Sequence, residues 1–190
     1  MNKVNTLPSD GQIYDSKTIF LHWLSAALVM GLWMLGQSID LFPRGEARVA
    51  VRSLHISFGV VLGIVLVIRL FWRQTGGARL PAADVGPSGR IATGVHHLLY
   101  ALMVGLVVIG VACIWIRGDN IFNLFRIPSL APGNKALAHN AVELHGLVAN
   151  VLLAVAAIHA AAAVWHHWRL KDGVLRRMWP GLAVRLGVAP

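Results

Sequence analysis

Four long stretches of this sequence carry no Asp, Glu, Lys or Arg side chain. They lie between Lys17 and Asp40, between Arg52 and Arg69, between Arg90 and Arg117, and from Leu144 to Trp168. A helix needs roughly 20 apolar residues to cross about 30 Å of hydrocarbon, and each stretch is close to that length. The sequence therefore predicts an all-α integral membrane protein, a four-helix bundle with transmembrane helices near residues 18–38, 53–73, 94–116 and 141–166.

The composition agrees with a membrane protein of one domain. Of the 190 residues, 56% are hydrophobic and 13% are charged, whereas soluble domains carry about a quarter charged residues. The first apolar stretch is too long for the core of a signal peptide, and no small-residue cleavage site follows it. We therefore expect a permanent anchor and a single membrane domain over residues 1–190.

The distribution of Lys and Arg predicts the orientation. Four helices place both termini on one side, and eleven of the 17 basic residues belong to the termini and to the stretch from Arg69 to Arg90 that connects the second helix to the third, against six in the other two loops. Lys3 and Arg185 are among the eleven. Because cytoplasmic loops are enriched in Lys and Arg, the termini should be cytoplasmic. The net charge of +9 then has a membrane explanation, and no nucleic-acid partner is expected.

Two histidines share one face of the last predicted helix. His145 and His159 are 14 residues apart, which at about 100° per residue is about 40° short of four full turns, and about 21 Å along the axis. His22 lies near the cytoplasmic start of the first helix, and His55 near the outer start of the second. The histidines therefore pair by depth, His22 with His159 inside and His55 with His145 outside.

Such pairs indicate a cofactor. A neutral imidazole in a low-dielectric bundle needs a partner, and two imidazoles on facing helices can bind one iron from opposite faces of a haem. The prediction is two b-type haems. An isolated histidine near a helix end is otherwise interfacial or hydrogen-bonded. Gly59 and Gly63 follow His55 on the same face and would give a porphyrin room, although small residues also serve helix packing.

The sequence also resembles a known family. The segments "FLHWLSAAL", "SLHISFGVVLGIVLVIRLFWR", "HHLLYALM", "LHGLVANVLLAVAAIHAAAAVWHHW" and "LKDGVLRRMWP" are similar to the bacterial cytochrome b561 family, over about residues 16–180. The resemblance implies a four-helix inner-membrane protein with two b haems that passes electrons between a donor and quinone. It places the axial iron ligands at His22, His55, His145 and His159.

Other side chains are candidates for the same sites. His96 and His97 begin the third helix about 100° apart, so at most one of them faces the inner haem; the family has a histidine at the position of His96, four residues before Tyr100. His166 lies two turns beyond His159 and could donate a proton to a quinone; in similar family members the matching histidine lines the quinone pocket. Either His96 or His166 could instead be interfacial.

The outer side has its own polar candidates. Arg52 lies one turn before His55 and is a candidate for binding a haem propionate. Glu143 could form an ion pair with Arg52, transfer protons at the outer haem, or simply lie at the membrane interface. His139 is expected in the loop before the fourth helix.

The proposed reaction follows from the resemblance. Electrons would enter at the outer haem from a periplasmic donor and leave from the inner haem to ubiquinone. Some family members oxidise superoxide, which makes superoxide the expected donor. Two alternatives stay open. One is a membrane-anchor cytochrome subunit that relays electrons between quinone and a partner dehydrogenase. The other is a histidine-containing transporter without haem.

Overall fold

The computed structural model describes residues 13–81 and 86–181. Lys3 and Arg185, which enter the charge comparison, lie outside the described residues. In chain order the elements are α1 (Ser16–Ser38), the 3-10 helix η2 (Ile39–Leu41), α2 (Glu46–Thr75), α3 (Pro87–Arg117), strands β1 (Asn120–Ile121) and β2 (Phe125–Arg126), α4 (Lys135–Trp165), the π-helical segment η3 (His166–Leu170) and α5 (Val174–Met178).

The four predicted membrane helices are confirmed, and each of them begins earlier than the charge-free stretch suggested. The segments that are long and apolar enough to cross a membrane are 16–41, 46–75, 87–117 and 135–170. The helices continue past the hydrocarbon because charged residues are good helix formers where water can reach them. One expectation is wrong as a result. His139 belongs to α4, because the Asn134 side chain caps this helix by accepting the Leu137 N–H at 3.0 Å.

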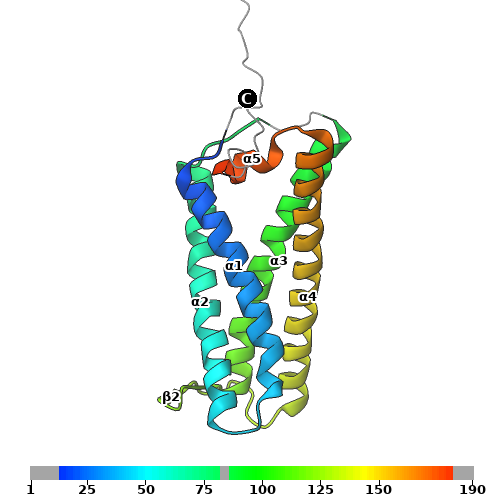
Figure 1. Ribbon diagram of the computed structural model, residues 1–190. Coiled ribbons are helices and arrows are strands. Elements are labelled where there is room, and N and C mark those ends of the chain that lie inside the picture. The colour runs from blue at the N-terminus through cyan, green and yellow to red at the C-terminus, as the bar shows by residue number, and fades with distance from the viewer. Residues whose placement is uncertain (1–12, 82–85, 182–190) are drawn as a thin grey trace, which may run out of the picture.

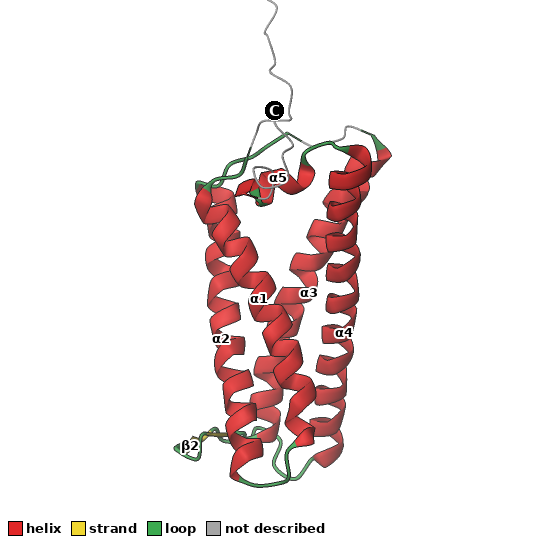
Figure 2. Cartoon of the chain, in the orientation of Figure 1, coloured by secondary structure: helices red, strands yellow, loops and turns green. Residues whose placement is uncertain are grey.

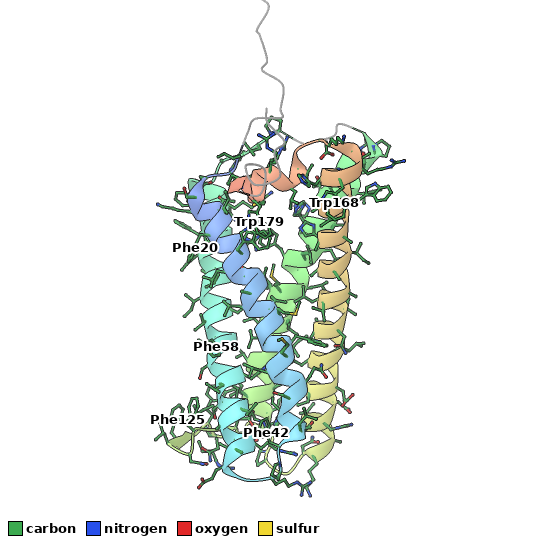
Figure 3. The ribbon with its side chains drawn as sticks, viewed as in Figure 1. Phe20, Phe42, Phe58, Phe125, Trp168 and Trp179 are labelled. Atoms are coloured by element: carbon green, nitrogen blue, oxygen red, sulfur yellow. The ribbon has the colours of Figure 1, made fainter. Side chains whose placement is uncertain are left out.

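The long helices stand side by side as two hairpins, α1 with α2 and α3 with α4 (Figures 1 and 2). Leu66, Met103 and Leu152 form a buried core between α2, α3 and α4. Large apolar side chains point away from the bundle, among them Phe20 and Phe58, whose exposed fractions are 64% and 44% (Figure 3). A surface this apolar is stable when lipid covers it.

The two ends of the bundle differ. We call the end where α1 begins and α4 finishes the terminal end, and the end that carries the β1–β2 hairpin the hairpin end (Figure 1). In the hairpin, Asn120 pairs with Arg126 and Ile121 with Phe125. Gly118, with φ +66°, ends α3 in the left-handed conformation and turns the chain into this hairpin.

At the terminal end α5 lies across the bundle. The Trp23 indole N–H donates to the Met178 carbonyl at 2.9 Å, and the Trp23 and Trp179 rings meet edge to face with their centres 5.1 Å apart. The Tyr14 N–H donates to the Arg177 carbonyl at 3.1 Å. The segment after η3 is therefore fixed to the start of α1.

Asp15 joins the start of α1 to the end of α2. Its carboxylate caps α1 by accepting the Thr18 N–H at 2.9 Å. It also accepts the Trp72 indole N–H at 3.0 Å and the Ala78 N–H at 3.1 Å. Burial opposes ionisation, but the hydrogen bonds from Thr18, Ala78 and Trp72 outweigh it and lower the pKa of Asp15 below its ordinary value.

Candidate functional site: two histidine pairs

Two pairs of histidine rings meet edge to face inside the bundle, one pair near each end. The rings of His55 and His145 have their centres 6.1 Å apart, and those of His22 and His159 are 6.5 Å apart. Two imidazoles that bind one metal ion from opposite sides at about 2 Å each place their ring centres about 6 Å apart. The pairs that helix depth predicts therefore lie together, at a spacing that suits a metal ion between the rings.

Arg69 on α2 contacts the pair at the terminal end. Its Nη2 donates to His22 Nδ1 at 3.0 Å, and its guanidinium lies 5.1 Å from the centre of the Tyr100 ring. The sequence analysis counted Arg69 only among the basic residues that set the orientation, and it did not predict the contact with His22. A signal was present, since Arg69 follows His55 by the same 14 residues that separate His145 from His159 and so shares its helix face.

His96 lies beside the same pair. Its ring centre is 5.1 Å from that of His159, and its Nδ1 donates to the Ala92 carbonyl at 2.7 Å. Because a carbonyl only accepts, Nδ1 carries a proton and the other ring nitrogen is free for another partner. His96 is thus the residue of the His96–His97 pair that reaches His159.

At the hairpin end the backbone makes room for both imidazoles. A Cβ atom on Gly36 would come within 3.3 Å of His55 Cε1, and a Cβ atom on Gly110 within 3.1 Å of His145 Cε1. The two rings therefore pack directly on the backbones of α1 and α3. Within residues 13–81 and 86–181, the buried Nδ1 atoms of His55 and His145 find no hydrogen-bond partner.

The two glycines noted in the sequence have different surroundings. A Cβ atom on Gly59 would meet nothing within 4 Å, and Gly59 lines a cavity. Gly63 packs against Val107, at 3.3 Å from a Cβ atom placed on it. Gly59 thus leaves space beside His55, whereas Gly63 serves helix packing.

The cavity beside His55 and His145 has a volume of about 260 Å³ and mostly apolar walls. Its polar lining includes Arg52, Arg117 and Asp119. Asp119 is 8% exposed and lies 3.7 Å from Arg52 Nη1 and 3.5 Å from Arg117 Nε. Burial raises the pKa of Asp119, although both arginines oppose this. Three charges therefore meet at this wall, with one positive charge in excess.

The sequence analysis did not single out Arg117 or Asp119 as residues of this site. Arg52 pairs with Asp119, and Glu143, which the sequence offered as one possible partner, is exposed. Asp119 comes from the turn after α3, and it reaches Arg52 because the β1 segment packs against α2: the Ser53 hydroxyl accepts the Phe122 N–H at 2.8 Å. No local pattern in the sequence signals that long-range contact.

His166 lies at the start of η3 and contacts a residue that the sequence analysis did not single out. Its Nδ1 is hydrogen-bonded to Asp172 Oδ2, and Asp172 Oδ1 accepts the Val174 N–H at 3.1 Å. His166 is therefore held by the turn that leads into α5. It remains separate from the His22–His159 ring contact.

The side chains at the two histidine pairs are of the types that bind b-type haem. Each pair offers two imidazoles in facing positions, two of the imidazole nitrogens are buried without a partner, and arginines lie near both pairs, where an anionic propionate would need them. His55 and His145 also border a cavity with mostly apolar walls.

Comparisons with known proteins place this chain among bacterial membrane cytochromes. Residues 13–181 match the family described as prokaryotic cytochrome b561. The chain is 30% identical over 176 residues to a probable superoxide oxidase CybB of Yersinia pestis, covering 88% of this chain and 96% of that protein. It is 31% identical over 161 residues to cytochrome b561 homolog 2 of Escherichia coli K12, covering 83% and 86%. It is 28% identical over 175 residues to cytochrome b562 of Cereibacter sphaeroides, covering 87% and 94%.

The match spans all four long helices and α5, and the family implies b-type haem and electron transfer in the membrane. Four membrane-crossing helices and this match make the protein a multi-pass protein of the bacterial inner membrane. The chain belongs to the prokaryotic cytochrome b561 family.

Proposed function

We propose that this chain is a dihaem b-type cytochrome that carries electrons across the inner membrane from periplasmic superoxide to ubiquinone. The observation that carries the proposal is the presence of two facing imidazole pairs, with ring centres 6.1 and 6.5 Å apart, near opposite ends of one bundle. When bound, each haem supplies a one-electron carrier whose iron has no open position. We assign one haem to His55 and His145 and the other to His22 and His159.

The other residues of each site would hold and shield its cofactor. Gly36 and Gly110 set the positions of the His55 and His145 rings, and Arg52 and Arg117 offer guanidinium groups to a propionate. At the terminal end, binding iron through Nε2 of a neutral His22 requires its proton on Nδ1. Arg69 then gives up its contact with Nδ1 and is available to a carboxylate. The apolar helices keep water away from both sites.

The orientation follows from charge. The terminal end carries most of the basic residues and is assigned to the cytoplasm, which places the hairpin end in the periplasm. The excess positive charge of Arg52, Arg117 and Asp119 at the hairpin end favours a small anion. The name of the Yersinia pestis relative, a probable superoxide oxidase, supports superoxide as that anion.

Quinone is assigned to the terminal end. His166 lies at the edge of the span there, and His96 lies against His159. Reduction of a quinone needs protons as well as electrons, and an imidazole can both hydrogen-bond a quinone oxygen and donate a proton. His166 is assigned as the proton donor, and His96 as a neighbouring polar group.

Stopped-flow measurement of superoxide decay with the purified protein tests this function. We expect fast, catalytic decay only when a soluble ubiquinone is present, with one quinol formed for every two superoxide ions consumed. The His145→Ala variant, lacking the proposed outer haem, is the matched control and should not accelerate the decay. Decay that ignores ubiquinone would contradict the proposal, as would a need for an added dehydrogenase, which would instead indicate an anchor subunit.

A further inference from the structure

The turn between η3 and α5 has a shape that brings Asp172 back to His166. Lys171 and Gly173, on either side of Asp172, both have positive φ, +53° and +74°. Glycine adopts this conformation freely, whereas a residue with a side chain does so only where its surroundings require it. The chain therefore reverses at Asp172, and this carboxylate faces the helix it has just left.

Both oxygens of the Asp172 carboxylate are engaged. One is hydrogen-bonded to His166 Nδ1, and the other accepts the Val174 N–H at the start of α5, at 3.1 Å. The side chains of His166 and Asp172 are 30% and 28% exposed, so both are partly shielded from water. The backbone contact fixes the carboxylate, and the carboxylate fixes the imidazole ring.

This contact determines what His166 can do chemically. A carboxylate accepts, so Nδ1 of His166 carries a proton, and Nε2 is the nitrogen left to exchange a proton with another molecule. A carboxylate at Nδ1 fixes the tautomer and the orientation of an imidazole, as in other enzymes that use this pair. The pair is thus arranged as a proton donor through Nε2.

Of the described side chains on the elements packed against this turn, Asp172 is the only acid beside His166. On the elements packed against this turn, the titratable and charged side chains near the terminal end are His159 on α4, His167 and Arg169 on η3, and Arg176 and Arg177 on α5, together with Lys171 in the turn itself. Lys135, His139 and His145 of α4 lie toward the hairpin end. All of these are basic. The other acid on these elements, Glu143, lies toward the hairpin end of α4.

We propose that Asp172 is the positioning residue of a proton-donating pair with His166, which protonates the quinone as it is reduced. This proposal rests on the proposed function, because it needs quinone at the terminal end. Two superoxide ions lose one electron each and become two O₂, and ubiquinone gains those two electrons and two protons to become ubiquinol. In each proton transfer the His166 Nε2–H bond breaks as a quinone O–H bond forms, and the imidazole then recovers a proton from cytoplasmic water.

The test follows haem reoxidation by a soluble ubiquinone at neutral pH, using Asp172→Asn, Asp172→Glu and His166→Ala. We expect His166→Ala to slow reoxidation by about 10²–10⁴-fold, the usual contribution of a general acid. Asp172→Asn should slow it at least tenfold at neutral pH, because the amide can present its NH₂ group to Nδ1 and hold the wrong tautomer of His166, and Asp172→Glu should restore most of the rate. Asp172→Asn in the His166→Ala background should add little.

A readout that does not depend on turnover accompanies these rates. In the reduced, diamagnetic protein the Nδ1 proton shared with a carboxylate should give a far-downfield proton resonance, absent in both His166→Ala and Asp172→Asn. Haem content and spectra of the Asp172 variants should match those of the wild type.

The outcomes separate the two proposals. If His166→Ala leaves reoxidation unchanged, the assignment of quinone to this site is wrong. If His166→Ala slows reoxidation while Asp172→Asn leaves the rate unchanged, the pair is wrong and the quinone assignment stands. A loss of rate in Asp172→Asn that Asp172→Glu does not restore, or loss of a haem, would reduce Asp172 to a structural role and overturn the inference.

Discussion

Single atoms decide how closely the histidine rings approach their neighbouring helices. His55 and His145 rest against Gly36 and Gly110, where an added methyl group would meet the ring carbon Cε1 at 3.3 and 3.1 Å. These glycines have no Cβ to displace the ring, and an imidazole that shifts by a few tenths of an ångström changes its fit to any bound metal. The glycines of α1 and α3 are therefore as much part of the His55–His145 site as the imidazoles.

We expect Gly110→Ala to disturb the site through this contact. Overpacking a fitted interior costs roughly 1–3 kcal/mol, which exceeds the gain of about 1 kcal/mol from replacing glycine by alanine in a helix. The variant should melt at a lower temperature and bind less haem. Gly105→Ala on the same helix is the matched control, because a Cβ there meets nothing within 4 Å. Equal melting temperature and haem content in the two variants would refute this account.

Much of the residue-level site could be predicted from the sequence, and the exceptions have a common cause. Helical periodicity relates residues on one helix, so the depth of each histidine followed from its position in its span. Asp119 and Asp172 reach their partners through turns whose path depends on Gly118, Lys171 and Gly173. A single sequence does not reveal where such turns direct the chain.

At the scale of elements, the ends of the helices carry the specific interactions. Lipid-facing residues are interchangeable apolar groups, whereas Asp15 fixes α1 to α2 and α5 is tied to α1 by Trp23. The charge-free stretches predicted where the helices cross the membrane. They did not predict that α4 begins at Lys135 or that η3 becomes π-helical, because caps and polar flanks decide those boundaries.

Asp15→Ala should destabilise the protein by about 1–3 kcal/mol at neutral pH, since it removes a helix cap and two long-range hydrogen bonds. The pKa of Asp15 is lowered in the folded protein, so its contribution is present above the ordinary value of about 4 and is lost as pH falls below it. Thermal melting in detergent from neutral to acid pH should show the difference from wild type shrinking.

Asp40→Ala at the other end of α1 provides the comparison. Asp40 is 87% exposed and pairs with Arg48 at the surface, where ion pairs contribute little. Its removal should change melting only slightly. A similar loss in both variants, or a difference for Asp15→Ala that persists unchanged in acid, would contradict the role given to Asp15.

At the scale of the whole molecule, the direction of electron flow depends on the orientation in the membrane. Eleven basic residues against six assign the terminal end to the cytoplasm. Reporter fusions at residue 85 and at the C-terminus should both be active only with a cytoplasmic reporter. A fusion at residue 85 that is active in the periplasm would reverse the orientation and exchange the donor and quinone sides.

We propose that one chain holds two haems, each on its own histidine pair. Pyridine haemochrome titration against protein concentration measures this directly, in the wild type and in His145→Ala, His159→Ala and His139→Ala. His139 lies on the same helix outside both pairs and serves as the control. We expect two haems per chain in the wild type and in His139→Ala, and one in each of the other variants. Two haems retained in either His145→Ala or His159→Ala would show that the histidine pairs are wrongly assigned.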